Sequence, residues 1–143
     1  VFTYSPVHTD DYYVKKAKEL IALGVDGIFL KDASGLLRPE RVATLVPALK
    51  KVMGKMPLQI HTHCNSGLAP YVVLQAVEHG VDVVHTATST LANGVSHSPT
   101  ETVARNLRRR GFDVEIDLGP IEEAAPGLHR RGRRQACGRG EGI

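Results

Sequence analysis

His61 and His63 are the residues whose types and spacing point most directly to chemistry. They stand two positions apart in the apolar run LQIHTH, which has the character of a strand. Side chains two positions apart on a strand point to the same face, so these two imidazoles can share one metal ion. The spacing alone is a weak signal, because a pair of structural histidines satisfies it equally well.

Lys31 and Asp32 close the preceding apolar run, VDGIFLKD. A lysine at the end of a strand can simply extend into solvent. Alternatively, burial lowers its pKa, and the neutral amine then reacts with carbon dioxide to give a carbamate, an oxygen ligand for a cation. Asp32 either supports the histidines or Lys31 from outside, or caps the turn through Gly35. The residues themselves leave both pairs of readings open.

Three further side chains lie at strand ends. Thr86 and Thr88 share one face at the end of the next apolar run, where they either bind a substrate or close the strand. Cys64 follows His63 directly and therefore points to the opposite face, which indicates packing rather than metal binding.

Strand-like and helix-like runs alternate along the chain, and this order predicts a parallel α/β sheet covered by helices. Polar residues at the carboxyl ends of such strands are where α/β proteins build their sites. The hydrophobic spacing and the Gly and Pro positions predict strands over residues 1–4, 25–31, 58–63 and 81–86, helices over 9–23, 39–53, 69–78 and 99–110, and a short last strand over 114–116.

Composition limits the class of protein. With 143 residues, 42% of them hydrophobic and 23% charged, the chain is long enough for one globular domain but falls short of the roughly 250 residues of a complete (β/α)8 barrel. No apolar run reaches about 18 residues, so we expect no membrane insertion. The start lacks the pattern of a signal peptide and the two cysteines make no disulfide framework, which favours the cytoplasm.

The net charge of +3 is a property of the end of the sequence, since residues 129–143 contain five Arg and one Glu. No aromatic residue stands among these arginines, so we do not expect nucleic-acid binding. Residues 120–143 lack apolar periodicity and are rich in Arg and Gly, and we expect a disordered tail there.

The chain resembles the carboxyltransferase domain of biotin-dependent enzymes, a family whose members include pyruvate carboxylase, the oxaloacetate decarboxylase alpha subunit and the transcarboxylase core subunit. The most specific part is the pair KDASGLL and HTHCNSG, in that order; related barrel lyases share the two histidines but lack the lysine. The resemblance covers about residues 1–118 and lies in the stretches YSPVHT, LKDASGLLRP, QIHTHCNSGLAP, GVDVVHTATSTLANG and HSPTETVARNL.

This resemblance implies a (β/α)8 TIM barrel, of which residues 1–119 would form roughly strands 5 to 8. It also implies a divalent metal (zinc, manganese or cobalt) held by His61, His63 and a carbamylated Lys31, with Asp32 beside it as a catalytic residue. The biotin cofactor would contact Thr86, Ser96 and His97.

The implied activity is reversible, metal-dependent carboxyl transfer between oxaloacetate or pyruvate and biotin. The partners would be a small 2-oxo acid substrate and a biotin carrier on a separate domain or subunit, since the sequence has no carrier motif around a biotinylated lysine. A homo-oligomer is expected. This stretch of chain would be inactive alone, and its open strand edges predict self-association or aggregation.

Two residues depart from the family pattern. Val95 stands where pyruvate carboxylase-type members have a threonine that moves a proton to and from biotin, and His85 stands where an aspartate is usual. Two alternatives remain: a metal-dependent aldolase or lyase of the same barrel superfamily, or an inactive fragment that serves only as a binding or assembly module.

Overall fold

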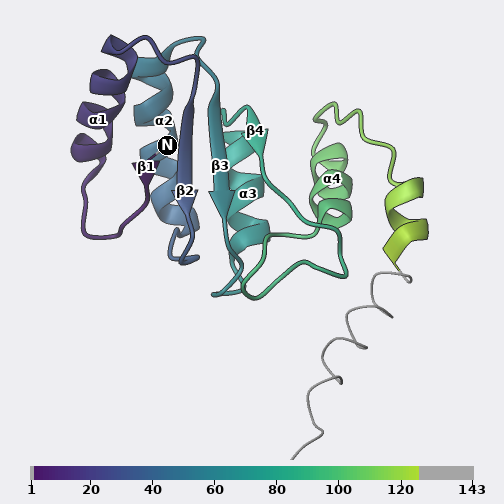
Figure 1. The fold of residues 1–143 in the computed structure, drawn as a ribbon. Coiled ribbons are helices and arrows are strands. Elements are labelled where there is room, and N and C mark those ends of the chain that lie inside the picture. The colour runs from purple at the N-terminus through teal and green to yellow at the C-terminus, as the bar shows by residue number, and fades with distance from the viewer. Residues whose placement is uncertain (1, 126–143) are drawn as a thin grey trace, which may run out of the picture.

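The structure is a computed structural model and describes residues 2–125 of the chain. Four strands form one parallel sheet in the order β1-β2-β3-β4, so each strand pairs with the next along the chain and a helix connects them (Figure 1). The elements are β1 (Phe2–Thr3), α1 (Asp10–Ala22), β2 (Ile28–Asp32), α2 (Pro39–Met53), β3 (Leu58–Thr62), α3 (Ala69–Glu78), β4 (Val83–Val84) and α4 (Thr100–Arg109).

Helix boundaries follow local sequence signals. The Thr9 side chain caps α1 by accepting a hydrogen bond from the Tyr12 amide at 3.3 Å. Helix α2 starts with Pro39, which needs no amide partner in the first turn, and is capped after Met53 by Gly54, whose φ of 58° favours glycine. The predicted bounds of α2 and α3 are confirmed, and those of α1 and α4 differ by one residue at each end.

The strands are shorter than their apolar runs. β2 begins only at Ile28, and β4 is reduced to two residues because only these two pair with β3. The strand expected over 114–116 is wrong. The Arg108 guanidinium instead donates hydrogen bonds to the carbonyls of Val114 and Ile116, so these acceptors are satisfied without a neighbouring strand.

The two faces of the sheet have different surroundings. Helices α2 and α3 cover one face, and no described helix covers the other (Figure 1). On the covered face Ile28, Leu30, Leu58 and Ile60 are at most 1% exposed, and each such side chain stabilises the fold by about 1.5–3 kcal/mol. The residues between them in sequence are half-buried and point to the open face.

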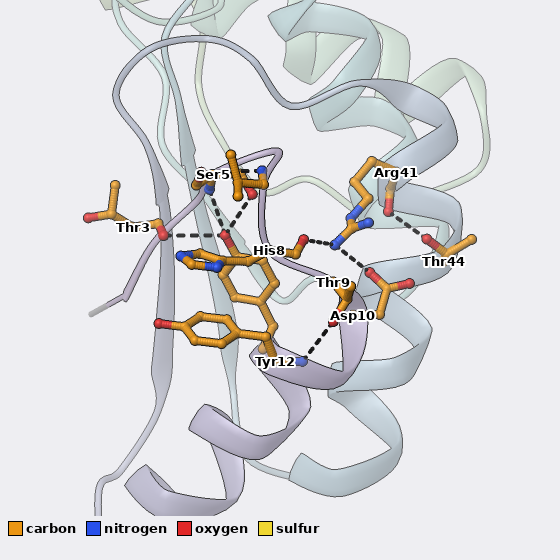
Figure 2. A network of polar contacts seen from close by, with 10 residues as sticks. Thr3, Ser5, His8, Thr9, Asp10, Tyr12, Arg41 and Thr44 are labelled. Atoms are coloured by element: carbon orange, nitrogen blue, oxygen red, sulfur yellow. Dashed lines mark hydrogen bonds and ion pairs between the residues drawn. The ribbon is translucent and has the colours of Figure 1, made fainter.

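The loop between β1 and α1 is fixed to both neighbouring helices (Figure 2). The fully buried Tyr13 accepts a hydrogen bond from the Ser5 amide at 2.6 Å. From α2, Arg41 donates to the His8 carbonyl at 2.7 Å and pairs with Asp10 at 3.0 Å. These contacts hold the loop at the edge of the sheet where the strands end.

The last described residues of the chain form a short helix. Of residues 120–143, for which a disordered tail is expected, 120–125 are helical here, and 126–143 lie outside the described residues. Among the described helices, none combines the length and apolar character needed to cross a membrane.

Candidate metal centre

His61 and His63 meet at the end of β3, as their spacing predicts. His61 is the fourth residue of the strand and His63 follows its last residue, so both rings turn to the open face. Their Nε2 atoms lie 3.1 Å apart. Two nitrogens that share one zinc ion at about 2.0–2.1 Å each stand at a similar separation, so this pair fits a common cation.

A third imidazole, that of His97, joins this pair. One ring nitrogen from each of His61, His63 and His97 lies within 4.8 Å of the others, and all three residues are half-buried. The ring centroids of His61 and His97 are 4.2 Å apart, and those of His63 and His97 are 4.7 Å apart. This histidine trio is a donor set that suits zinc and similar transition metals.

Backbone carbonyls orient two of these rings. Nδ1 of His63 lies 2.7 Å from the Val95 carbonyl, and Nδ1 of His97 lies 3.1 Å from the Thr62 carbonyl. Because a carbonyl oxygen only accepts, each Nδ1 must carry the proton. In the neutral rings Nε2 therefore keeps its lone pair, and a ring whose other nitrogen is held this way is the usual arrangement of metal-binding histidines.

His61 is the most electrostatically perturbed member of the trio. Burial lowers its pKa to about 4, and the neighbouring His97, His63 and His85 rings and Lys31 act in the same direction. Its Nδ1 lies 3.1 Å from Nδ1 of His85, whose own pKa burial also lowers. His61 is therefore neutral at pH 7, as a metal ligand must be.

Lys31, the third expected ligand, lies beside His61 in the sheet. The two residues are register partners in β2 and β3, and Lys31 is half-buried on the open face. The amine therefore stands on the same side of the sheet as the histidine trio, and its positive charge contributes to the low pKa of His61.

Asp32, expected to be catalytic, is placed differently. Its side chain is 1% exposed and lies on the helix-covered face. One carboxylate oxygen accepts from the Leu36 amide at 3.0 Å, and the other accepts from the Leu37 amide at 2.9 Å and from the Thr62 hydroxyl at 2.8 Å. The structure therefore does not bring Asp32 to the histidines but uses it to hold the turn between β2 and α2.

The remaining expected site residues lie around the loop between β4 and α4. Thr86 accepts a hydrogen bond from the Thr100 hydroxyl at 2.8 Å. Ser96 acts through its carbonyl, which accepts from the amide of Cys64 at 2.7 Å. Cys64 itself is buried, which confirms the packing role predicted for it.

His97 is expected from the sequence to contact biotin, and its place beside His61 and His63 is not predicted. Its position depends on the fold-back of a loop more than thirty residues away in sequence, through the bond from Cys64 to Ser96. No local periodicity reports such a contact. The one available signal is that His97 lies in the loop that follows β4, at the same edge of the sheet as the carboxyl end of β3.

The chain is similar in sequence to known proteins over most of its length. Residues 4–126 match the HMGL-like family model. A pyruvate carboxylase subunit of Methanocaldococcus jannaschii is 43% identical over 122 residues, which are 85% of this chain and 21% of that protein. The methylmalonyl-CoA carboxyltransferase 5S subunit of Propionibacterium freudenreichii subsp. shermanii is 40% identical over 123 residues, 85% of this chain and 24% of that protein.

The fold of the chain also matches that of a solved structure. The carboxyl transferase domain of Rhizobium etli pyruvate carboxylase, determined with pyruvate and biocytin, superposes with a TM-score of 0.88 at 30% sequence identity. The alignment covers 94% of this chain and 24% of that one. The chain thus spans about a quarter or less of the length of the relatives that it matches.

Proposed function

The chain belongs to the HMGL-like family and has the fold of one part of a carboxyltransferase (β/α)8 barrel, roughly strands 5 to 8; from this premise we propose that it contributes to metal-dependent carboxyl transfer between oxaloacetate or pyruvate and biotin. The observation that carries the proposal is the histidine trio at the carboxyl-terminal edge of the parallel sheet, the edge at which barrel enzymes place their chemistry. A protein with this site would take a 2-oxo acid as its substrate.

A divalent cation fits the donor set of this site. His61 and His63 would hold it, together with Lys31 as a carbamate. When bound, such a cation polarises the oxygens of a 2-oxo acid and stabilises the negative charge left when the carboxyl group departs.

The residues of this chain prepare that site in three ways. The low pKa of His61 keeps its ring neutral at physiological pH. The carbonyls of Val95 and Thr62 hold the other two rings through their Nδ1 atoms. Asp32 holds the turn after β2 and so keeps Lys31 at the end of its strand. The first effect leaves the ring able to donate a lone pair, and the other two order donors before any ligand arrives, which lowers the entropy cost of binding.

Biotin would approach along the loop between β4 and α4. We propose that Thr86 and Ser96, which both lie between β4 and α4, contact biotin. Val95 has no hydroxyl with which to move a proton, so another group must serve that step. A biotin carrier on a separate domain or subunit, a homo-oligomeric assembly and a cytoplasmic location complete the proposal.

The test is an assay of the complete gene product with the carrier or with free biocytin. We expect biotin-dependent decarboxylation of oxaloacetate, measured as pyruvate formed, and its loss in His61→Ala and His63→Ala. His79→Ala serves as the matched control, because His79 closes α3 at the opposite edge of the sheet. Two results would contradict this proposal and support the lyase alternative. One is decarboxylation whose rate does not depend on biotin, and the other is cleavage of a 2-oxo acid into an aldehyde and pyruvate.

A further inference from the structure

We propose that Glu101 is a positioning residue for biotin: from helix α4 it fixes the loop between β4 and α4, and through this loop it sets the affinity of the site for biotin. The inference rests on the proposed function, in which Thr86 and Ser96 of the same loop contact biotin. Glu101 acts through the loop and touches neither biotin nor the metal.

Glu101 is a buried carboxylate whose partner lies in the preceding loop. It is the second residue of α4 and is 5% exposed. Its two carboxylate oxygens accept from the backbone amide of Ser89 at 3.2 and 3.1 Å. Burial by itself raises the pKa of Glu101, but hydrogen bonds from its own amide and from Ser89, together with the charge of Arg105, keep that pKa below its usual value. Glu101 is therefore an anion at pH 7, and hydrogen bonds to an anion are stronger than those to a neutral acceptor.

The turn that contains Ser89 has few other ties. The amide of Leu91 donates to the Thr88 carbonyl at 2.8 Å, which closes the turn on itself. The hydroxyls of Thr88 and Thr90 are buried, and neither has a hydrogen-bond partner within the described part of the chain. Among the described side chains, that of Glu101 therefore ties this turn to the rest of the fold.

The base and the far arm of the loop are held by bonds that do not involve this carboxylate. The amide of Ala87 donates to the Ser98 carbonyl at 3.1 Å, and the amide of Thr100 donates to the Ala87 carbonyl at 2.8 Å. In the far arm, the Ser96 carbonyl accepts from the amide of Cys64 at 2.7 Å. Loss of the carboxylate should therefore loosen the arm that follows β4 and leave the arm that faces the histidine trio in place.

Helix α4 gives the carboxylate a rigid base. Its residues Val103 and Leu107 are buried against Val73 and Leu74 of α3. An acidic side chain that served only the helix would need only the amides of the first turn, where it interacts favourably with the helix dipole. The bond to Ser89, which lies twelve residues earlier, goes beyond that role and points to a function in placing the loop.

The first experiment compares the steady-state kinetics of variants of the complete gene product with biocytin and with oxaloacetate. Glu101→Ala should raise KM for biocytin by about tenfold and change KM for oxaloacetate by less than about twofold, because only the biotin contacts are displaced. Glu101→Gln keeps one oxygen acceptor for the amide and should recover most of the wild-type affinity. A residue that only stabilises the fold would not separate the two KM values in this way.

Two matched variants control for stability and for charge. Val42→Ala removes buried apolar volume in α2, so it should lower the melting temperature without changing KM for biocytin. Glu122→Gln removes a negative charge beside α4, where Glu122 pairs with Arg105, and should also leave KM for biocytin unchanged.

Hydrogen exchange of the same proteins measures the loop directly. In Glu101→Ala the amide of Ser89 has lost its acceptor and should exchange faster than in the wild type. The amide of Cys64 should keep its exchange rate, because its bond to Ser96 does not depend on the carboxylate.

Three results would overturn the inference: an unchanged KM for biocytin in Glu101→Ala, equal rises in KM for biocytin and for oxaloacetate, or an unchanged exchange rate of the Ser89 amide. Each of them leaves the proposed function intact as long as the wild-type protein needs biotin. Decarboxylation by the wild type that does not respond to biotin would instead remove the proposed function, and the inference with it.

Discussion

The two faces of the sheet perform different tasks, and Lys31 and Asp32 show this within one peptide bond. Lys31 lies half-buried on the open face, beside His61. Asp32 lies on the helix-covered face at 1% exposure, with three hydrogen-bond donors around its carboxylate. Strand alternation thus places Lys31 on the face that carries the histidine trio and Asp32 where it holds the turn.

The difference between the faces is one of solvent and partners. On the covered face a polar group must be fully bonded, because burying it unpaired costs free energy. On the open face the imidazoles keep one nitrogen each free of any backbone acceptor, and water or a ligand can occupy that side. Stability should therefore depend on the covered face, and metal binding on the open face.

The largest effect is expected from Asp32→Ala, which should lower the stability of the fold without changing metal binding. The change leaves the amides of Leu36 and Leu37 and the hydroxyl of Thr62 without their acceptor, and we expect a loss of about 3 kcal/mol or more in the free energy of unfolding. Urea unfolding followed by circular dichroism measures it, with the exposed Asp26→Ala as the control. Zinc bound per folded molecule should stay unchanged; loss of zinc from folded Asp32→Ala protein would contradict the separation.

The pH dependence of the metal-free protein probes the open face. The pKa of His61 falls from 6.5 to about 4 on folding, so between these values the unfolded chain binds more protons than the folded chain. Stability therefore rises with pH across this window and is lost as the pH falls from 6.5 toward 4. We expect the melting temperature to drop in that direction with EDTA present, and His61→Gln to flatten the slope.

The control for this titration is His79→Gln, which should keep the wild-type slope. His85 contributes in the same direction, since burial lowers its pKa as well. An identical pH slope in wild type and His61→Gln would mean that His61 titrates normally, and the ring would then be solvated rather than buried among its neighbours.

A smaller effect is expected from His85, whose ring lies next to that of His61. Their Nδ1 atoms are 3.1 Å apart, so His85 can accept the proton that His61 must carry on Nδ1 when its Nε2 binds a cation. We expect His85→Phe to weaken zinc binding by about tenfold, the lower end for loss of an outer partner. His85→Gln keeps an acceptor and should lose less. Equal losses in both variants, measured by isothermal titration calorimetry, would argue for a packing role.

Local signals explain how much of the fold the sequence predicts. Pro39, Gly54 and Gly80 mark helix boundaries through their own backbone preferences, and the bounds of α2 and α3 are predicted to the residue. The failures are non-local. The segment 114–116 has a strand-like composition, yet its carbonyls bind the Arg108 guanidinium, a contact that no period in the sequence reports.

Local signals likewise predict the strand residues of the candidate site but not its loop residue. His61 and His63 follow from alternation along one strand, and the same rule, applied to Lys31 and Asp32, sets those two residues on opposite faces. His97 cannot be placed in this way, because it reaches the site through the bond between Cys64 and Ser96 on different loops. Sequence periodicity predicts which face a strand residue takes, whereas loop closure decides which loop residue joins it.

The smallest effect is expected from Val95→Thr, which tests whether the main chain alone orients the trio. The Val95 side chain is 83% exposed, while its carbonyl accepts the bond from His63 at 2.7 Å. Adding a hydroxyl at this position should therefore change neither zinc affinity nor, beyond about 0.5 kcal/mol, the free energy of unfolding. Calorimetric zinc titration and urea unfolding measure both quantities. A large change in zinc affinity would show that the side chain at position 95, and not only its carbonyl, controls the His63 ring. Metal binding would then depend on this loop as well as on the residues of the open face.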